Sequence, residues 1–164
     1  MTTLLLPVVH RQLTALSVPH EEMACDPKLA DTAAFCEHYG VDPADSANTI
    51  VVASRRPPDQ FAVCLALATT RLDVNRAVRD ALGWKKLSFA SADATLDLTG
   101  MQIGGVTPFG LPDGLPILVD AAVMDRDQIV LGGGNRSSKI LMPPDGLHAL
   151  ATVRVVEGLA TPLD

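Results

Sequence analysis

Met101-Gln-Ile-Gly-Gly-Val-Thr-Pro-Phe-Gly-Leu-Pro-Asp-Gly-Leu-Pro-Ile-Leu118 is the segment around which the sequence is organised. This central segment, residues 101–118, holds four of the 12 Gly and three of the 12 Pro of the chain, although its other residues are mostly apolar. Gly104 and Gly105 allow another backbone or a ligand to come close, and the prolines stiffen the segment. A stiff loop with open backbone N–H groups suits ligand binding. The alternative is a tight structural turn between two buried strands.

The composition indicates one folded domain, which we place at residues 1–164. Of the 164 residues 48% are hydrophobic, and a chain of this length buries roughly 70% of its unfolded surface. No apolar run is long enough to span a bilayer, and the first residues lack the basic start of a signal peptide. Cys25, Cys36 and Cys64 form no C-x-x-C pair, which favours reduced thiols and a cytoplasmic location.

The charge and the aromatic content argue against two classes of nucleic-acid binder. The net charge is −6 and no basic stripe covers a long segment, which argues against tight, non-specific binding to duplex DNA. Only 4% of the residues are aromatic, too few for a base-stacking platform. We therefore expect neither a DNA nor a membrane partner, while local contact with the end of a nucleic acid stays open.

The hydrophobic pattern predicts a mixture of helices and strands. Apolar residues spaced by three and four predict an amphipathic helix after Pro7. Asp26-Pro27 opens a second helix that ends at Gly40, and Asp73 is expected to cap a third helix over residues 74–82. Further helical turns are expected at 91–98 and after Pro143.

Strands are predicted between these helices. Residues 48–69 form a hairpin with continuously apolar strands, so we expect cover on both of its faces. Residues 20–25 are expected to be an extended link. The remaining expected strands are 85–89, 117–120, 128–131, 139–142 and 152–156.

The common phosphate, nucleotide, metal and nucleophile motifs do not fit the sequence. The run Gly133–Lys139 lacks the Gly-Lys-Ser/Thr ending of a P-loop, and Pro143-Pro144 leaves no room for the required helix. Gly104-Gly105 does not have the spacing of a dinucleotide fingerprint, and no serine lies in a nucleophile elbow. We expect no cofactor and no metal site, because no common zinc spacing relates the candidate ligands His20, Cys25, Cys36 and His38.

Three motifs together resemble the YbaK-like domain, the editing domain found inserted in, or free-standing beside, bacterial prolyl-tRNA synthetases. The resemblance covers residues 20–155 and implies an α/β fold, a single domain with a mixed, strongly curved β-sheet flanked by helices. It also implies hydrolysis of the ester in mischarged tRNA, typically tRNA(Pro) carrying Ala or Cys. The motifs, in chain order, are Thr99-Gly-Met-Gln-Ile-Gly-Gly-Val-Thr-Pro-Phe-Gly110, Leu115-Pro-Ile-Leu-Val-Asp120 and Ile129-Val-Leu-Gly-Gly-Gly-Asn-Arg136.

The chemistry of ester hydrolysis suits the central segment. The reaction needs a held carbonyl, a water molecule and stabilisation of the oxyanion, which backbone N–H groups can supply. We predict the catalytic loop at Gly104, Gly105, Thr107 and Pro108. The resemblance implies that the substrate's terminal ribose hydroxyl assists, so no protein nucleophile is required. It also implies substrate binding on the opposite wall by residues 133–136, namely Gly133, Gly134, Asn135 and Arg136.

The sequence departs from the family pattern at Asn48, where family members usually carry a lysine associated with gripping the tRNA end. Asn can hydrogen-bond but carries no charge, and the Gly-Gly-Lys-Arg type of turn is also altered, with Asn135 in place of Lys. Either Arg136, Lys139 or Arg55 holds the substrate end instead, or hydrolysis is weak or absent.

Two functions follow from this departure. We expect a trans-editing aminoacyl-tRNA deacylase whose partner is a tRNA acceptor end with its attached amino acid, with an aminoacyl-tRNA synthetase as a candidate second partner. The alternative is a non-catalytic protein that kept the fold and binds aminoacyl-tRNA, a nucleotide or a synthetase.

Overall fold

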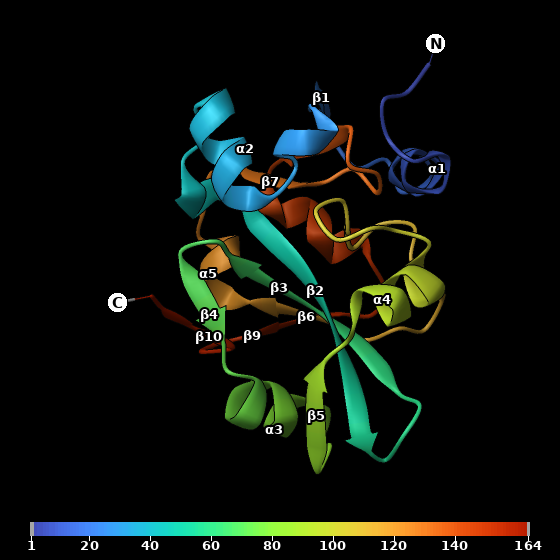
Figure 1. Cartoon of the computed structure of the whole chain (residues 1–164), viewed down its shortest axis with the longest axis vertical. Helices are drawn as coiled ribbons and strands as arrows, with labels where there is room; N and C mark the ends of the chain where they lie inside the picture. The colour runs from blue at the N-terminus through green and yellow to red at the C-terminus, as the bar shows by residue number, and fades with distance from the viewer. Residues whose placement is uncertain (1, 164) are drawn as a thin grey trace.

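The computed structural model describes residues 2–163, so Met1 and Asp164, the ends of the predicted domain, lie outside it. Its largest sheet has five strands in the order β5-β2-β3-β6-β9, and the long strand β2 crosses the middle of the molecule (Figure 1). The bounds of these strands are β2 (Ala47–Arg56), β3 (Phe61–Leu67), β5 (Lys86–Phe89), β6 (Ile117–Asp120) and β9 (Val153–Val156).

The five-stranded sheet is mixed, which confirms the predicted α/β class. Strands β2 and β3 form the predicted antiparallel hairpin with Val51 opposite Val63, and β5 adds to β2 in antiparallel fashion. Strand β3 is parallel to β6, and β6 is parallel to β9. The strong curvature of the sheet stays a prediction.

A second, antiparallel sheet lies beside the first and has the order β1-β8-β7, with β1 (Glu21–Ala24), β7 (Ile129–Gly132) and β8 (Ser138–Met142). A parallel bridge between Ser46 and Val130 connects β7 to the start of β2. The prediction of a mere link at residues 20–25 was wrong, because Glu21–Ala24 pairs along the edge of β8. A third pair, β4 (Thr70–Leu72) with β10 (Ala160–Pro162), was not predicted.

The α-helices α1 (Pro7–Ala15), α2 (Thr32–Tyr39) and α4 (Ala92–Thr99) confirm three of the predicted helical regions. The predicted helix 74–82 is instead a π-helical turn, Val74–Val78, followed by the short α3 (Arg79–Leu82), and the Asp73 side chain caps neither. No helix within residues 2–163 has the length and apolar character needed to cross a membrane. The remaining helical segments are α5 (Ala121–Met124) and the 3-10 turns Pro27–Leu29, Pro43–Asp45 and Pro144–Ala149.

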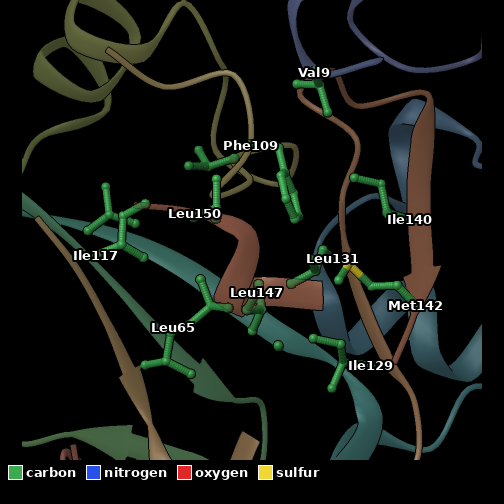
Figure 2. Packing of buried hydrophobic residues seen from close by; sticks show 14 of the residues in the cluster. Val9, Leu65, Phe109, Ile117, Ile129, Leu131, Ile140, Met142, Leu147 and Leu150 are labelled. Atoms are coloured by element: carbon green, nitrogen blue, oxygen red, sulfur yellow. The ribbon is translucent and has the colours of Figure 1, made fainter. Parts of the chain in front are cut away.

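The two faces of the β2–β3 hairpin are both buried, as its continuous apolar runs predicted. Val63 and Leu65 pack into the main core, whereas Ala62 and Cys64 pack into a second cluster on the opposite face. The central segment closes the main core, where Phe109 is fully buried. Figure 2 shows Phe109 near side chains from both sheets, so the apolar residues of the central segment serve packing as well as the site.

Candidate active site

A cavity of about 260 Å³ lies where the two sheets meet the central segment. The start of β2 forms one wall, β7 and β8 form another, and the N-terminus of α2 and the central segment complete the rim. The cavity therefore depends on contacts between segments that are far apart in the chain. Its lining residues are Asp31, Thr32, Ser46, Ala47, Asn48, Thr49, Ile50, Ile103, Gly104, Val106, Val130, Leu131, Gly132 and Lys139.

Asn48 lines this cavity from the start of β2, and its contact with substrate stays a prediction. Its Oδ1 atom accepts a hydrogen bond of 2.6 Å from the Oγ1 atom of Thr32, the first residue of α2. The hydrogen bond fixes the amide oxygen, and with it the orientation of the side chain. Thr32 and Asn48 also line a neighbouring apolar groove, so this pair separates two hollows.

Two residues of the central segment that line the cavity have backbone N–H groups without an acceptor among the described residues. Gly104 and Val106 both line it, and the N–H of each has no acceptor within residues 2–163. The N–H of Gly105 instead donates to the Gln102 carbonyl at 2.9 Å, so it is not free to hold an oxyanion. The structure thus favours Gly104 and Val106 as the donor pair, rather than the predicted Gly104 and Gly105.

The other two predicted catalytic residues lie behind the cavity wall. Thr107 is fully buried, and its Oγ1 atom has no hydrogen-bond partner within the described part of the chain. Pro108 lines a separate small hollow beside Gln12. Neither residue lines the cavity, so their predicted part in catalysis stays a prediction that the geometry does not favour.

The 132–138 turn packs against the central segment. The two backbones come so close that position 132 must be glycine. A Cβ atom added at Gly132 would lie 2.6 Å from the carbonyl oxygen of Val106, too close for any side chain. The N–H of Gly134 donates to the carbonyl of Gly105 at 2.7 Å. This contact fixes the distance between the turn and the central segment, and so the width of the cavity.

Most of the predicted substrate-binding turn faces away from the cavity. Gly133 lies close to Ser138. Gly134 lies close to Leu6 and Val9. Asn135 donates from Nδ2 to the carbonyl of Leu4 at 3.1 Å. These three residues do not line the cavity, so their expected contact with substrate stays a prediction that the geometry does not favour.

Arg136 joins the central segment to the region before α2. Its Nη1 atom donates to the carbonyl of Ile103 at 2.6 Å and to Oδ1 of Asp31 at 3.1 Å. Its Nε and Nη2 atoms donate to the carbonyl of Pro27 at 3.2 and 2.9 Å. The guanidinium group is therefore occupied by protein acceptors, and its geometry supports a role in holding the rim rather than gripping a tRNA end.

Lys139, one of the three alternative cations that the sequence offered, is buried in the cavity wall. Only 7% of the residue is exposed, and Nζ donates to the carbonyls of Ala30 at 2.8 Å and Gly104 at 2.9 Å. The ammonium also lies 5.0 Å from the centre of the Phe35 ring, within range of a cation–π interaction. Lys139 lines the cavity, whereas Arg55 lies near the far end of β2, outside the lining.

Burial is the main cause of the shifted pKa of Lys139. It lowers the pKa of the ammonium below the ordinary value of 10.5, and the nearby Arg136 acts in the same direction. Cys25, Cys36 and Asp31 act in the opposite direction. Asp31 is only a weak counterion, because 71% of its side chain is exposed and its Oδ1 is held by Arg136.

The sequence pattern missed Val106 and Thr32 as site residues, and it named Lys139 only as one of three alternative cations. The one available signal was a charged residue placed directly before the apolar run Ile140-Leu141-Met142 in a buried strand. A buried lysine in such a strand needs partners, and those partners come from distant segments. No group of three or more His, Cys, Asp or Glu side chains in the described residues is arranged to hold a metal ion.

Comparison with known families matches residues 26–150 to the aminoacyl-tRNA editing domain. The chain belongs to this editing-domain family. The matched residues include both sheet walls of the cavity, the central segment and Lys139, so the cavity described above lies wholly within the editing domain.

The chain is also similar to individual proteins and solved structures. The chain is 29% identical over 97 residues to the uncharacterized protein YwhH of Bacillus subtilis (strain 168), a match that spans 59% of this chain and 60% of that protein. Two solved structures share the editing-domain fold. The hypothetical protein APE2540 is 21% identical with a TM-score of 0.83, covering 94% of this chain and 99% of that one. A protein proposed to be a trans-editing enzyme for prolyl tRNA synthetase is 20% identical with a TM-score of 0.79, covering 92% and 94%.

Proposed function

We propose that the protein hydrolyses the ester bond of mischarged aminoacyl-tRNA, with tRNA(Pro) carrying a small wrong amino acid as its substrate. The observation that carries the proposal is the pair of unbonded N–H groups at Gly104 and Val106, on the wall of a cavity of about 260 Å³ within an editing domain. Support for action in trans comes from the structural neighbour that is itself proposed to edit for prolyl tRNA synthetase.

The reaction follows from the groups on the cavity wall. A water oxygen attacks the ester carbonyl carbon, and the resulting oxyanion accepts hydrogen bonds from the N–H groups of Gly104 and Val106. When the intermediate collapses, the bond to the ribose oxygen breaks and that oxygen takes a proton, which leaves the free amino acid and the intact tRNA. The family resemblance implies that the substrate's ribose hydroxyl assists, which agrees with a wall whose polar side chains are hydroxyl, amide, carboxylate and ammonium groups.

The apolar part of the cavity wall supports an amino acid with an uncharged side chain. The β2 and β7 walls bring Ile50, Val130 and Leu131 against it, and these apolar side chains suit a short aliphatic side chain rather than a charged one. Binding selectivity among small apolar side chains is modest, with a single methylene giving about 1–3 kcal/mol. We therefore expect the rates of hydrolysis to differ only moderately between small apolar amino acids.

A second function is favoured by one specific observation. Asn48 carries no charge, and its Oδ1 is already bonded to Thr32, so the β2 wall offers no cation to a tRNA end. A protein that binds aminoacyl-tRNA, a nucleotide or a synthetase without hydrolysis would have such a wall.

Deacylation assays separate these two functions. tRNA(Pro) charged with Ala, Cys or Pro is incubated with the purified protein, and the release of each amino acid is followed with time. We expect faster release of Ala or Cys than of Pro. A protein that binds the charged tRNAs but leaves all the esters intact would support the binding function instead.

A further inference from the structure

Lys139 is a buried positive charge without a buried negative partner. Moving an ammonium group out of water is costly unless hydrogen bonds or an opposite charge compensate. Asp31 does not fill this role, because its carboxylate is mostly exposed and bonded to Arg136. Two carbonyl oxygens and the Phe35 ring are what hold the ammonium in place.

One of the three N–H groups of the Lys139 ammonium has no hydrogen-bond acceptor among the described residues. An ammonium has three donors, and two of them are taken by the carbonyls of Ala30 and Gly104. The third has no oxygen acceptor within residues 2–163, and Lys139 lines the cavity. A buried N–H without an acceptor is expensive, so such a donor in a cavity wall points to an oxygen supplied by a ligand.

The ammonium of Lys139 also lies beside the proposed oxyanion site. Its Nζ atom holds the carbonyl of Gly104, whose own N–H is one of the two free donors of the central segment. An oxygen that is bound near Gly104 therefore lies close to the only buried ammonium group of the described residues.

We propose that Lys139 binds the carbonyl oxygen of the ester through its third N–H and acts with the N–H groups of Gly104 and Val106 on the developing oxyanion. This inference rests on the proposed function and names a further catalytic residue for it. The positive charge of the cavity is thus carried by β8, whereas the β2 wall contributes the neutral Asn48. The charged form of Lys139 stabilises the oxyanion more strongly than a neutral donor would.

The charge of Lys139 also predicts how the substrate lies. The α-amino group of an aminoacyl ester is a cation at neutral pH, so it is repelled by the ammonium and attracted by a carboxylate. Asp31 is the carboxylate that lines the cavity, and it lies at the exposed rim. The carbonyl oxygen therefore points toward Lys139, while the α-ammonium points toward Asp31.

The test measures the pKa of Lys139 in the intact protein with a bound substrate analogue. The chain has only four lysines, so the Cε signals of isotope-labelled protein can be assigned with single variants such as Lys28→Arg. The probe is alanine joined through an amide to the ribose of adenosine, which resembles the terminal nucleotide but resists hydrolysis. Its control is the alkene isostere of that amide, which has the same shape without the carbonyl oxygen.

The proposal makes a directional prediction for the two compounds. An oxygen that accepts a hydrogen bond from the ammonium favours the charged form, so the amide compound raises the pKa of Lys139. The isostere binds more weakly and leaves the pKa unchanged or lower, and the other lysines, Lys28, Lys85 and Lys86, do not respond to either compound. The charged groups around Lys139 that could contribute are Asp31, Arg136, Cys25 and Cys36. The isostere controls for all of them.

Activity gives a second readout. Lys139→Met keeps the length of the side chain and removes the charge, and we expect kcat/KM for deacylation to fall by roughly tenfold to a hundredfold, mostly through kcat. If the amide compound binds and the pKa of Lys139 does not move, the contact with the carbonyl oxygen is refuted while the proposed function stands. If neither compound binds and no charged tRNA is hydrolysed, the proposed function itself is refuted, and this inference with it.

Discussion

The hydroxyl of Thr32 at the start of α2 donates to the amide oxygen of Asn48 on β2, over an Oγ1–Oδ1 distance of 2.6 Å. The two residues are 16 positions apart in the chain and together form the partition between the cavity and the neighbouring apolar groove. The residue at position 48 therefore affects both hollows, and its identity is the main departure of this chain from the family pattern.

The first prediction concerns Asn48→Lys. A lysine here adds a cation beside the cavity that can contact a terminal phosphate or ribose of the tRNA, worth about 1–3 kcal/mol when the hydrogen bond is charge-assisted. We expect deacylation or affinity for the tRNA end to rise by roughly fivefold to 150-fold. Measurements of both quantities on wild-type and variant protein decide the point.

Thr32→Val is the control for this substitution, because it removes the same hydrogen bond without adding charge. It should lower stability slightly and should not reproduce the gain. If Asn48→Lys folds normally and changes neither deacylation nor binding, Asn48 is not part of the site and serves only the local structure.

The second prediction concerns Gly104→Ala. Gly104 has a φ of +96°, and an added Cβ would meet the Arg136 guanidinium and lie 3.1 Å from Oδ1 of Asp31. The variant should displace the free N–H and lower deacylation by roughly tenfold to a hundredfold, as small misplacements of catalytic groups do. The backbone strain alone costs about 1–3 kcal/mol, which thermal unfolding will report.

Gly114→Ala is the matched control in the same segment. Gly114 has a φ of +79°, but no atom lies within 4 Å of the position of its Cβ. This variant should therefore carry a comparable strain and retain full activity. Equal activity in wild type and Gly104→Ala would remove Gly104 from the reaction.

The third prediction concerns the stability of the fold at alkaline pH. The pKa of Lys139 is lowered in the fold, so between that value and the ordinary value of 10.5 the unfolded chain binds more protons than the native one. The contribution of Lys139 to the free energy of unfolding therefore rises with pH across this range. Burial of the three thiols has the opposite sign above their ordinary value of 9.0, because it raises their pKa values.

Comparison with Lys139→Met keeps all the cysteines, so it removes the lysine together with its effect on the pKa values of Cys25 and Cys36. Urea unfolding at several pH values between neutral and 10.5 gives the two free energies. The difference, wild type minus variant, should grow as the pH rises. A difference that is constant or shrinks with pH would mean that the ammonium is not destabilised by its burial.

The fourth prediction concerns the thiols. Cys25, Cys36 and Cys64 are free and buried, and burial raises the pKa of Cys64 to about 12. Thiolate is the reactive form, so a thiol reagent at neutral pH should modify Cys64 only as fast as the protein unfolds. Mass spectrometry of protein treated with and without denaturant should find three modified thiols only after denaturation. A stable disulfide or bound zinc in purified protein would contradict the expectation of reduced thiols.

The sequence by itself determined most of the secondary structure and the class of the fold. Apolar periodicity located α1 and α2, and the continuous apolar runs of the β2–β3 hairpin predicted burial on both faces, which Val63 and Cys64 confirm. These signals are local, because side-chain spacing reflects the period of the helix or the strand. The run Gly104–Pro108 was recognised from its glycine and proline content and from the resemblance to the editing-domain family.

The tertiary structure alone decided which of the predicted site residues meet. Gly105 looked equal to Gly104 in the sequence, yet its N–H is used within the segment by Gln102. Arg136 looked like a free cation for a tRNA end, yet four hydrogen bonds tie it to the rim. Whether a polar group is available for substrate depends on the partners that folding brings to it. The partner of Gly105 is only three residues away but is set by the path of the loop, and the partners of Arg136 are 33 to 109 residues away.

The same reason explains the strand β1 and Lys139. Glu21–Ala24 has no strong strand pattern and becomes a strand only because the edge of β8 offers it hydrogen bonds. Lys139 sits at the start of that same strand β8, and its ammonium acquires its position and its lowered pKa from Ala30, Gly104 and Phe35. The sequence shows the residue types. Burial and unsatisfied hydrogen bonds arise only when folding brings distant segments together around the cavity.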